Sequence, residues 1–387
     1  MNKVEGYLFS SKNKISLEIE NGLIKKIENI SSFENKSSEK YFISPALFDN
    51  QINGYLGIEF SKPDLSLEDM RKVVKGLRKV GVGIFLPTVI TASFESLVNS
   101  FKNLSEAIKD KNIALSIPGF HLEGPYISPV EGYRGAHTLE HIRKPDWDEF
   151  QKINEAAEGK ILQVTLAPEV EGAIPFIEKC VQNNIVISLG HHNATTDEIK
   201  KAVDAGAKTV THLGNGLANE INRFKNPLWM QLTEDRLMSS IIVDGFHLLP
   251  EIVKTFYRAK GKDRLILTSD ITMLAGLSPG NYKWDGKDVV LTPEGIIMLP
   301  EQNVFAGASL PLIVGVGNIM KFTGCSLKEA VDMATVNPAK LYGFENMVNI
   351  KVGNPANLVL FKMNNYKPEI VQTIISGEMV FDNLSIK

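Results

Sequence analysis

The chain lacks most features that mark secreted, membrane-bound or disulfide-stabilised proteins. It has only two cysteines, Cys180 and Cys325, far apart and without a CxxC pair, which excludes a disulfide framework and is typical of a reduced protein. No run of about 18 apolar residues occurs, and the opening MNKVEGYLFSSKNK lacks the apolar stretch of a signal peptide. We therefore expect a cytoplasmic protein without membrane association.

The chain also lacks a strong charge of either sign. Its formal net charge is only -3 over 387 residues, and lysine and arginine form no stripe along the sequence. This argues against a nucleic-acid partner, and it means that any anionic ligand must be held by a few local groups. Hydrophobic residues make up 43% and charged residues 22%, values typical of a soluble globular protein.

Both ends of the chain read as β-strands. Near the start, the runs SLEIE and LIKKIENI flank Asn21-Gly22, and such a pair between strand-like runs is a strong hairpin signal. Near the end, NLVLFKM and EIVQTIISGEMVF predict two or three more strands with a Ser-Gly turn. We therefore predict one small β-sandwich domain built from residues 1–43 and 345–387.

The middle of the chain, residues 44–344, alternates short apolar runs with amphipathic segments, as expected of repeated β-then-α units. The apolar runs are SPALFD, GIFLPT, IPGFHLEG, LQVTLAPE, IVISLGHH, TVTHLG, SSIIVDG and LILTSD. Eight such runs predict an α/β fold with a closed (β/α)8 barrel of the TIM type, whose active site lies at the carboxyl ends of the strands. The segment 277–300, rich in turn signals, reads as an insertion after the eighth strand.

Histidine is concentrated at these predicted strand ends. All seven histidines lie between His121 and His247, and six fall in or just after a strand-end cluster, His141 being the exception. An isolated histidine is more often structural than functional. Histidines at successive strand ends of a barrel, however, converge on one space, and this favours a shared site.

Three side chains form the strongest candidate metal site: Glu123 in HLEGP, His191 in GHHNAT and His212 in THLGNG. Two imidazoles and a carboxylate are a common ligand set for one catalytic zinc-like ion, which leaves a position for an ionisable water. Zinc is our first expectation, although iron, nickel or cobalt would accept the same ligands. His192 is an alternative to His191, but adjacent strand residues face opposite sides.

Two further groups complete the predicted chemistry. Asp270, which ends LILTSD, would face the metal as general base and acid, with capping of the next segment as its alternative role. The loop after the sixth strand offers Asn215-Gly216 amides and the Arg223 guanidinium for a phosphate, although Arg223 would equally fit a surface position.

Taken together, the motifs make the chain resemble the N-acetylglucosamine-6-phosphate deacetylases of the amidohydrolase superfamily over nearly its whole length. The resemblance rests on HLEGPYI, GAH, GHHNAT, THLGNGL, DGFHL, the TSD after strand eight, TVNPAKLYGF and GNPANLVLF, in the family's order and at similar spacing. It implies a metal-dependent hydrolase that converts N-acetylglucosamine 6-phosphate to glucosamine 6-phosphate and acetate in amino-sugar catabolism, and it suggests a homodimer.

Carried over by residue, the resemblance implies that Glu123, His191 and His212 hold one divalent ion and that Asp270 is the general base and acid. It also implies a set of residues that contact the sugar phosphate or the acetamide. These are Ala136, His137, Asn215, Gly216, Arg223 and His247, together with Phe305, Ala306 and Gly307, which would close the sugar site.

The chain departs from the pattern of the family that it resembles at two places. Amidohydrolases usually carry His-x-His after strand one, whereas this chain has Gln51-x-Asn53, and neutral amides are poor ligands for a zinc-like ion. This favours a one-metal enzyme. The loop after His212 usually has an aromatic residue followed by Asn-Ala-Met, whereas here it reads Gly214-Asn215-Gly216-Leu217, which predicts a reshaped sugar pocket.

Three alternative functions stay open at this point. The substrate could be the epimer N-acetylgalactosamine 6-phosphate, because one hydroxyl group distinguishes the two sugars. A dihydroorotase or dipeptidase type of amidohydrolase would need the His-x-His that is absent here. A non-catalytic sugar-phosphate sensor would have no need for both a metal site and a base.

Overall fold

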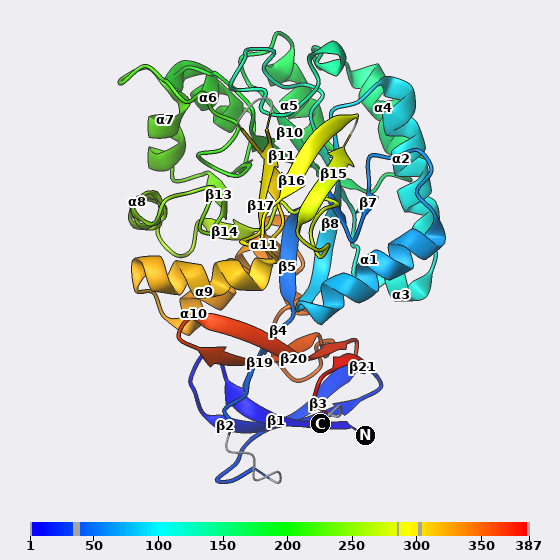
Figure 1. The fold of residues 1–387 in the computed structure, drawn as a ribbon, viewed down its shortest axis with the longest axis vertical. Coiled ribbons are helices and arrows are strands. Elements are labelled where there is room, and N and C mark those ends of the chain that lie inside the picture. The colour runs from blue at the N-terminus through cyan, green and yellow to red at the C-terminus, as the bar shows by residue number, and fades with distance from the viewer. Residues whose placement is uncertain (1, 34–38, 285, 301–303, 385–387) are drawn as a thin grey trace.

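The computed structural model describes residues 2–33, 39–284, 286–300 and 304–384. Its two parts are stacked along the long axis, a barrel surrounded by helices above and a smaller β-sheet part below, which holds both termini (Figure 1). Within the described ranges, every helix is too short or too polar to cross a membrane.

All eight predicted strand runs form the barrel, and all its strand pairs are parallel. Around the sheet they are β14 (Leu265–Thr268), β13 (Met238–Ile242), β12 (Thr209–Val210), β11 (Val186–Leu189), β10 (Ile161–Leu166), β9 (Phe120–Glu123), β8 (Val82–Ile90) and β5 (Leu47–Ile52). Two backbone hydrogen bonds close the seam just beyond β14: Asp270 N–H donates to Gln51 at 3.1 Å, and Asn53 N–H donates to Ile271 at 2.8 Å. The seam therefore places Asp270 beside the Gln51-x-Asn53 motif.

Helices cover the outside of the barrel. They are α1 (Leu67–Lys79), α2 (Phe94–Ala107), α3 (Lys111–Ala114), α4 (Trp147–Ala156), α5 (Ala173–Gln182), α6 (Thr196–Asp204), α7 (Pro227–Thr233), α8 (Pro250–Lys260), α9 (Leu312–Thr323), α10 (Leu327–Met333) and α11 (Val336–Tyr342). Their starts follow local sequence signals. Ser66 and Asp69 form a capping box at α1, and Thr195 and Glu198 form another at α6, so that otherwise unpaired backbone N–H groups are satisfied.

The two ends of the chain meet in one seven-stranded mixed sheet. Its order is β21 (Glu378–Asp382), β20 (Lys367–Ile375), β19 (Leu358–Asn364), β4 (Phe42–Pro45), β1 (Asn2–Leu8), β2 (Lys14–Glu20) and β3 (Leu23–Asn29). Figure 1 shows β19 and β20 lying over β1 and β2, and an apolar core that includes Leu17, Ile43 and Leu360 fills the space between them. This confirms the predicted sandwich made from both termini. The exact division at residues 43 and 344 stays a prediction.

Both predicted hairpin turns are present in this sheet. Asn21 and Gly22 have φ values of 51° and 81°, and Ser376 and Gly377 have 47° and 79°. Positive φ at both central residues is the signature of a type I′ turn, whose twist matches that of the flanking strands.

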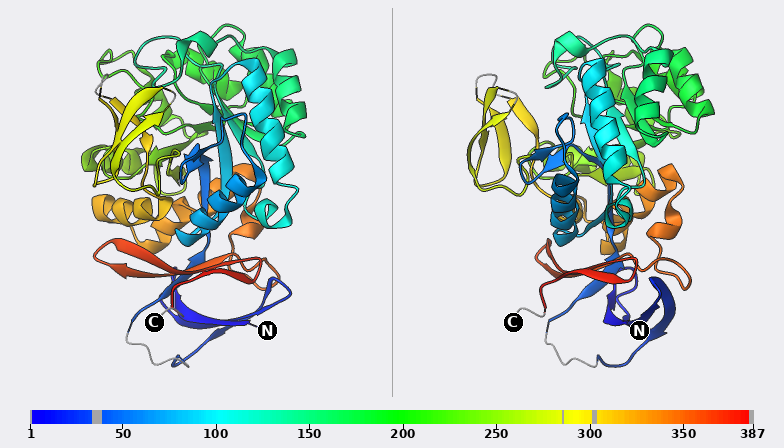
Figure 2. Two further views of the ribbon diagram at one scale, coloured as in Figure 1. Left: turned by 45° about the vertical axis from the view of Figure 1, so that its right-hand side comes forward. Right: turned by 90° about the vertical axis from the view of Figure 1, so that its right-hand side faces the viewer.

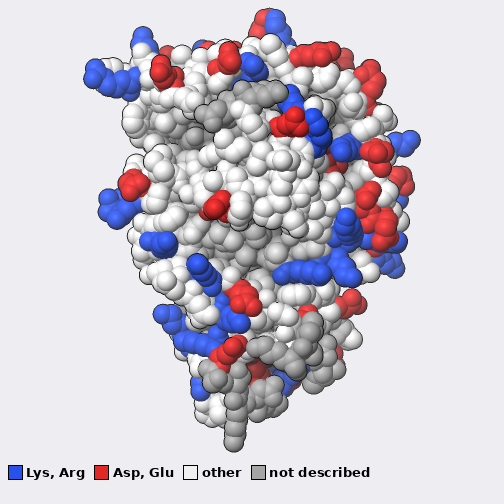
Figure 3. Space-filling model, in the orientation of Figure 1, with Lys and Arg blue, Asp and Glu red and all other residues white. Residues whose placement is uncertain are grey.

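The predicted insertion after the eighth strand is a four-stranded antiparallel sheet. It consists of β15 (Gly280–Trp284), β16 (Lys287–Leu291), β17 (Ile296–Leu299) and β18 (Val304–Ala308), and a two-stranded element, β6 (Gly54–Tyr55) and β7 (Ile58–Glu59), follows β5. The insertion extends past the predicted end at residue 300 because β18 pairs with β17. Figure 2 shows the sheet standing off one side of the barrel, and Figure 3 shows a largely uncharged surface in that region.

Candidate metal-dependent active site

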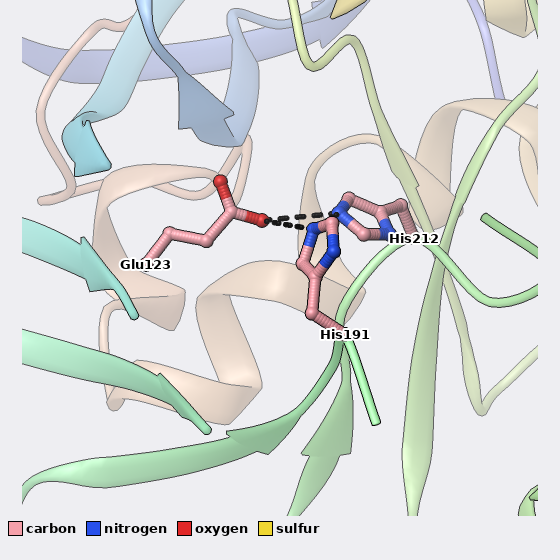
Figure 4. Close-up of side chains that lie close together, drawn as sticks. All are labelled: Glu123, His191 and His212. Carbon is pink, nitrogen blue, oxygen red and sulfur yellow. Dashed lines mark hydrogen bonds and ion pairs between the residues drawn. The ribbon is translucent and has the colours of Figure 1, made fainter. Parts of the chain in front are cut away.

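The three predicted metal ligands come together at the carboxyl ends of three barrel strands (Figure 4). Glu123 ends β9, and His191 and His212 follow β11 and β12 by two residues. Glu123 Oε1 lies 3.0 Å from His212 Nε2 and 3.4 Å from His191 Nε2, and the two nitrogens lie 3.2 Å apart. Four ligands at the 2.0–2.1 Å typical of zinc would lie about 3.3 Å from one another, so this spacing fits one divalent ion.

Hydrogen bonds to neighbouring groups orient the ligand atoms toward the position of the ion. His191 Nδ1 lies 3.0 Å from the Tyr133 carbonyl, an acceptor only, so Nδ1 carries the proton and the Nε2 lone pair faces Glu123. Burial alone would raise the pKa of Glu123, but the adjacent imidazoles of His191 and His212 hold this pKa well below its ordinary value. The cluster therefore offers an ionised carboxylate and an unprotonated imidazole nitrogen, as a metal requires.

Three ionisable residues of this site have a strained backbone. His191, His212 and Asp270 have φ values of 52°, 31° and 52°, in or near the left-handed region that side chains other than glycine rarely adopt. Each of the three lies two residues after the end of a barrel strand. All three side chains line one pocket, and such strain is often found at functional sites.

Asp270 follows β14 and lines the same pocket as the three predicted ligands. Burial raises its pKa to about 6, with Glu123 contributing to the rise. Asn53 Nδ2 donates to Asp270 Oδ1 at 2.7 Å. One carboxylate oxygen is thus held by an amide, which leaves the other for chemistry.

Gln51, the other member of the predicted Gln-x-Asn motif, also donates to a carboxylate. Its Nε2 lies 2.9 Å from Glu123 Oε1. Among the described residues, Glu123, His191 and His212 form the one cluster of ionisable side chains that could hold a metal ion. The two amides thus act as hydrogen-bond donors at the place where a His-x-His pair would ligate a second ion.

The site residues surround a pocket of about 190 Å³. Among the residues that line it are the ligand trio, Asp270, and seven of the predicted substrate contacts: Ala136, His137, Asn215, Gly216, His247, Phe305 and Gly307. Ala306 is fully buried behind this lining. Asn215 and Gly216 thus still reach the pocket despite the altered loop sequence. Gly216, at φ 60°, lies so close to His191 that a Cβ there would sit 2.7 Å from its Nδ1.

The two histidines predicted to contact the substrate are oriented by hydrogen bonds to neighbouring side chains. His137 contacts Thr91 Oγ1 at 2.8 Å and His191 Nε2 at 3.3 Å, and burial lowers its pKa to about 3. His247 Nδ1 lies 2.7 Å from Asp244 Oδ2. Asp244 therefore fixes the ring of His247, with Nε2 left available to a ligand.

Arg223 lies outside the pocket. Its side chain is exposed, and its guanidinium carbon sits 4.4 Å from the centre of the Phe224 ring, itself 73% exposed. The phosphate role of Arg223 stays a prediction that this conformation does not test. No lysine or arginine lines the described part of the pocket.

The remaining strand-end histidines lie outside the pocket. His121 is buried within the barrel, where it contacts Thr88 and Thr165, and burial lowers its pKa to about 4. His192 points away from the metal cluster toward Gln231. The structure thus favours His191 over His192 as the ligand, as the alternation of strand residues predicts.

Sequence reasoning missed Trp284 and Thr272, which line the pocket, and Asp244, which contacts the pocket residue His247. Asp244 had a signal, because it stands three residues before His247 in DGFH, a spacing that lets a carboxylate reach back to an imidazole. Trp284 and Thr272 had none, since both belong to segments around the insertion whose packing on the barrel is a tertiary property.

Comparisons with known proteins agree with this arrangement. The sequence profile of the amidohydrolase family matches residues 42–380. An N-acetylgalactosamine-6-phosphate deacetylase from Escherichia coli O157:H7 is 29% identical over 347 residues, covering 89% of each chain. The N-acetylglucosamine-6-phosphate deacetylase of Bacillus subtilis strain 168 is 30% identical over 341 residues, covering 87% of this chain and 84% of its own.

A solved structure extends the similarity to the fold. It is a mutant N-acetyl-D-glucosamine-6-phosphate deacetylase from Mycobacterium smegmatis in complex with N-acetyl-D-glucosamine-6-phosphate. It superposes with a TM-score of 0.85 at 27% identity, covering 95% of each chain. The protein therefore belongs to the amidohydrolase family and, within it, to the N-acetylglucosamine-6-phosphate deacetylases.

Proposed function

We propose that this protein is a metal-dependent deacetylase that hydrolyses N-acetylglucosamine 6-phosphate to glucosamine 6-phosphate and acetate. One observation carries the proposal. The Glu123, His191 and His212 cluster and the carboxylate of Asp270 line the same pocket at the mouth of the barrel. A pure binding protein would have no use for a metal site and a base that face each other.

Glu123, His191 and His212 would hold the ion, because their ligand atoms face one another at distances that suit a single divalent metal. An ion held there would polarise the acetamide carbonyl and lower the pKa of a nearby water. We propose zinc, and iron, nickel or cobalt would accept the same donors.

Asp270 would move the proton. Its pKa of about 6, raised by burial, lies close enough to neutrality for a group that must first accept a proton and then release it. It takes the proton from the attacking water as the water oxygen bonds to the acetyl carbon. It then donates the proton to the sugar nitrogen as the C–N bond breaks, so that acetate and the amine leave.

The remaining pocket residues would bind the sugar phosphate. His137 and His247 line the pocket with imidazole groups, and Asn215 and Gly216 line it with amides. The substrate carries a phosphate, and Arg223 is the guanidinium on the loop that also carries Asn215 and Gly216. We propose that Arg223 swings toward the pocket, or meets the phosphate in an assembled homodimer.

N-Acetylgalactosamine 6-phosphate is a second candidate substrate, favoured by the named activity of the Escherichia coli relative. The two sugars differ at one hydroxyl group. The loop 214–217 differs in sequence from the usual loop of the family, and its residues Asn215 and Gly216 line the pocket. We also propose a cytoplasmic location, which suits two buried free cysteines.

The test is an assay of metal-replete protein for acetate release. N-Acetylglucosamine 6-phosphate, its galactose epimer and unphosphorylated N-acetylglucosamine would be compared by kcat/KM. We expect turnover of a 6-phosphorylated sugar, and the ratio between epimers identifies the substrate. Tight binding of the sugar phosphates without acetate release would instead show a sensor.

A further inference from the structure

The pocket has two chemically different walls. The barrel supplies the ionisable wall, with Glu123, Asp270 and the ligand histidines. The insertion supplies Trp284 at the end of β15 and Phe305 on β18, which line the same pocket from outside the barrel. Phe305 lies 5.3 Å from His247, measured between ring centres.

The indole of Trp284 is anchored at its polar end. Its Nε1 donates to Glu59 Oε1 at 3.2 Å, and Glu59 ends β7, in the segment that follows the first barrel strand. This hydrogen bond uses the one donor that an indole has. The ring is therefore fixed between the insertion and the barrel, and what it offers the pocket is apolar aromatic surface.

A hexosamine ring suits such a pair of walls. Its acetamide and hydroxyl groups need polar partners, whereas the axial C–H groups on a pyranose face form an apolar patch with slightly positive hydrogens. An aromatic face carries the negative part of the ring quadrupole and attracts such hydrogens. We propose that Trp284 is a substrate-binding residue whose indole holds the pyranose ring of the substrate against the ionisable wall.

This inference deepens the proposed function, because it takes the sugar phosphate as the ligand. The stacked ring contributes binding in the ground state and the transition state alike, since Trp284 contacts no atom of the acetamide bond. Its loss should therefore raise KM and leave kcat nearly unchanged.

The first test is a kinetic comparison of Trp284→Ala, Trp284→Phe and Tyr282→Ala. Tyr282 is the matched control, since it is on the same strand and packs on the same apolar cluster of the insertion, but does not line the pocket. We expect Trp284→Ala to raise KM about tenfold, the upper end for an aromatic contact, and Trp284→Phe to keep most of the affinity. An equal KM change in Tyr282→Ala, or none in Trp284→Ala, overturns the proposal.

The second test needs no turnover. The chain has three tryptophans, and neither Trp147 nor Trp229 lines the pocket. Trp229 donates to the Arg223 carbonyl at 2.9 Å and would respond to a movement of Arg223, so it is replaced in the test. Titration with glucosamine 6-phosphate should change the intrinsic fluorescence of Trp229→Phe, but not that of the double variant Trp229→Phe with Trp284→Phe. A response that persists in the double variant overturns the proposal. A wild type that binds the sugar phosphate through Trp284 but releases no acetate contradicts the proposed function instead.

Discussion

The side-chain amide of Asn53 donates a 2.7 Å hydrogen bond to Oδ1 of Asp270. Two residues earlier, near the end of β5, Gln51 donates to Glu123 at 2.9 Å. A pair of neutral amides thus engages both carboxylates of the site. The Gln-x-Asn motif therefore has a positive role: it orients the proposed base and a proposed metal ligand.

We predict that Asp270→Asn keeps the fold and the metal but lowers kcat by on the order of a hundredfold or more, as expected for lost acid–base catalysis. Asparagine preserves the size of the side chain but cannot accept a proton from water. Thermal unfolding, metal content and kcat should be measured together. If Asp270 were only a cap, asparagine would serve almost as well, and kcat would stay near that of the wild type.

The pH profile should report the same group. Burial raises the pKa of Asp270 to about 6, and a base must be ionised, so we expect kcat/KM to fall as the pH drops through about 6. Asn53→Asp places a second carboxylate beside Asp270, which should raise that pKa and move the acid limb to higher pH. Asn53→Ala is the control. It removes a hydrogen bond that lowers the pKa of Asp270, so the acid limb should move in the same direction but by less. If the acid limb of the pH profile stayed unchanged in both variants, Asn53 would have no influence on the pKa of the base.

We predict one tightly bound divalent ion per chain, since Gln51 and Asn53 are donors to carboxylates and not ligands. Elemental analysis of metal-replete protein checks this, and chelation should abolish activity that one equivalent of metal restores. The double variant Gln51→His with Asn53→His supplies the missing imidazoles and should take up a second ion. Two ions per wild-type chain would contradict the assignment.

The role of Arg223 can be separated from general surface effects. Arg223→Ala should raise KM for the 6-phosphorylated sugar far more than for the unphosphorylated one, because the guanidinium pairs only with the phosphate. Lys225→Ala, on the same exposed loop, is the matched control. Equal effects of Arg223→Ala on the two sugars would show that Arg223 is structural.

Many structural features of this protein could be predicted from local sequence patterns. Eight apolar runs, each followed by a polar cluster, predicted the barrel strands, and Asn21-Gly22 predicted a hairpin, because strand periodicity and turn conformation depend on neighbouring residues alone. The convergence of Glu123, His191 and His212 also followed, since parallel strands of a barrel bring their carboxyl ends to one mouth.

Other features were decided only by the tertiary structure. Whether Gln51 and Asn53 have hydrogen-bond partners depended on the closure of the barrel, which brings the end of β5 beside the end of β14. More than 200 residues separate Asn53 from its partner Asp270 in the sequence. The place of Trp284 depended on how the insertion packs against the barrel, and the exposed position of Arg223 on how its loop folds. The sequence by itself determined the strands and the chemical types at their ends, because these follow from short-range order. Which side chains face one another across the pocket followed from long-range packing, which no local pattern records.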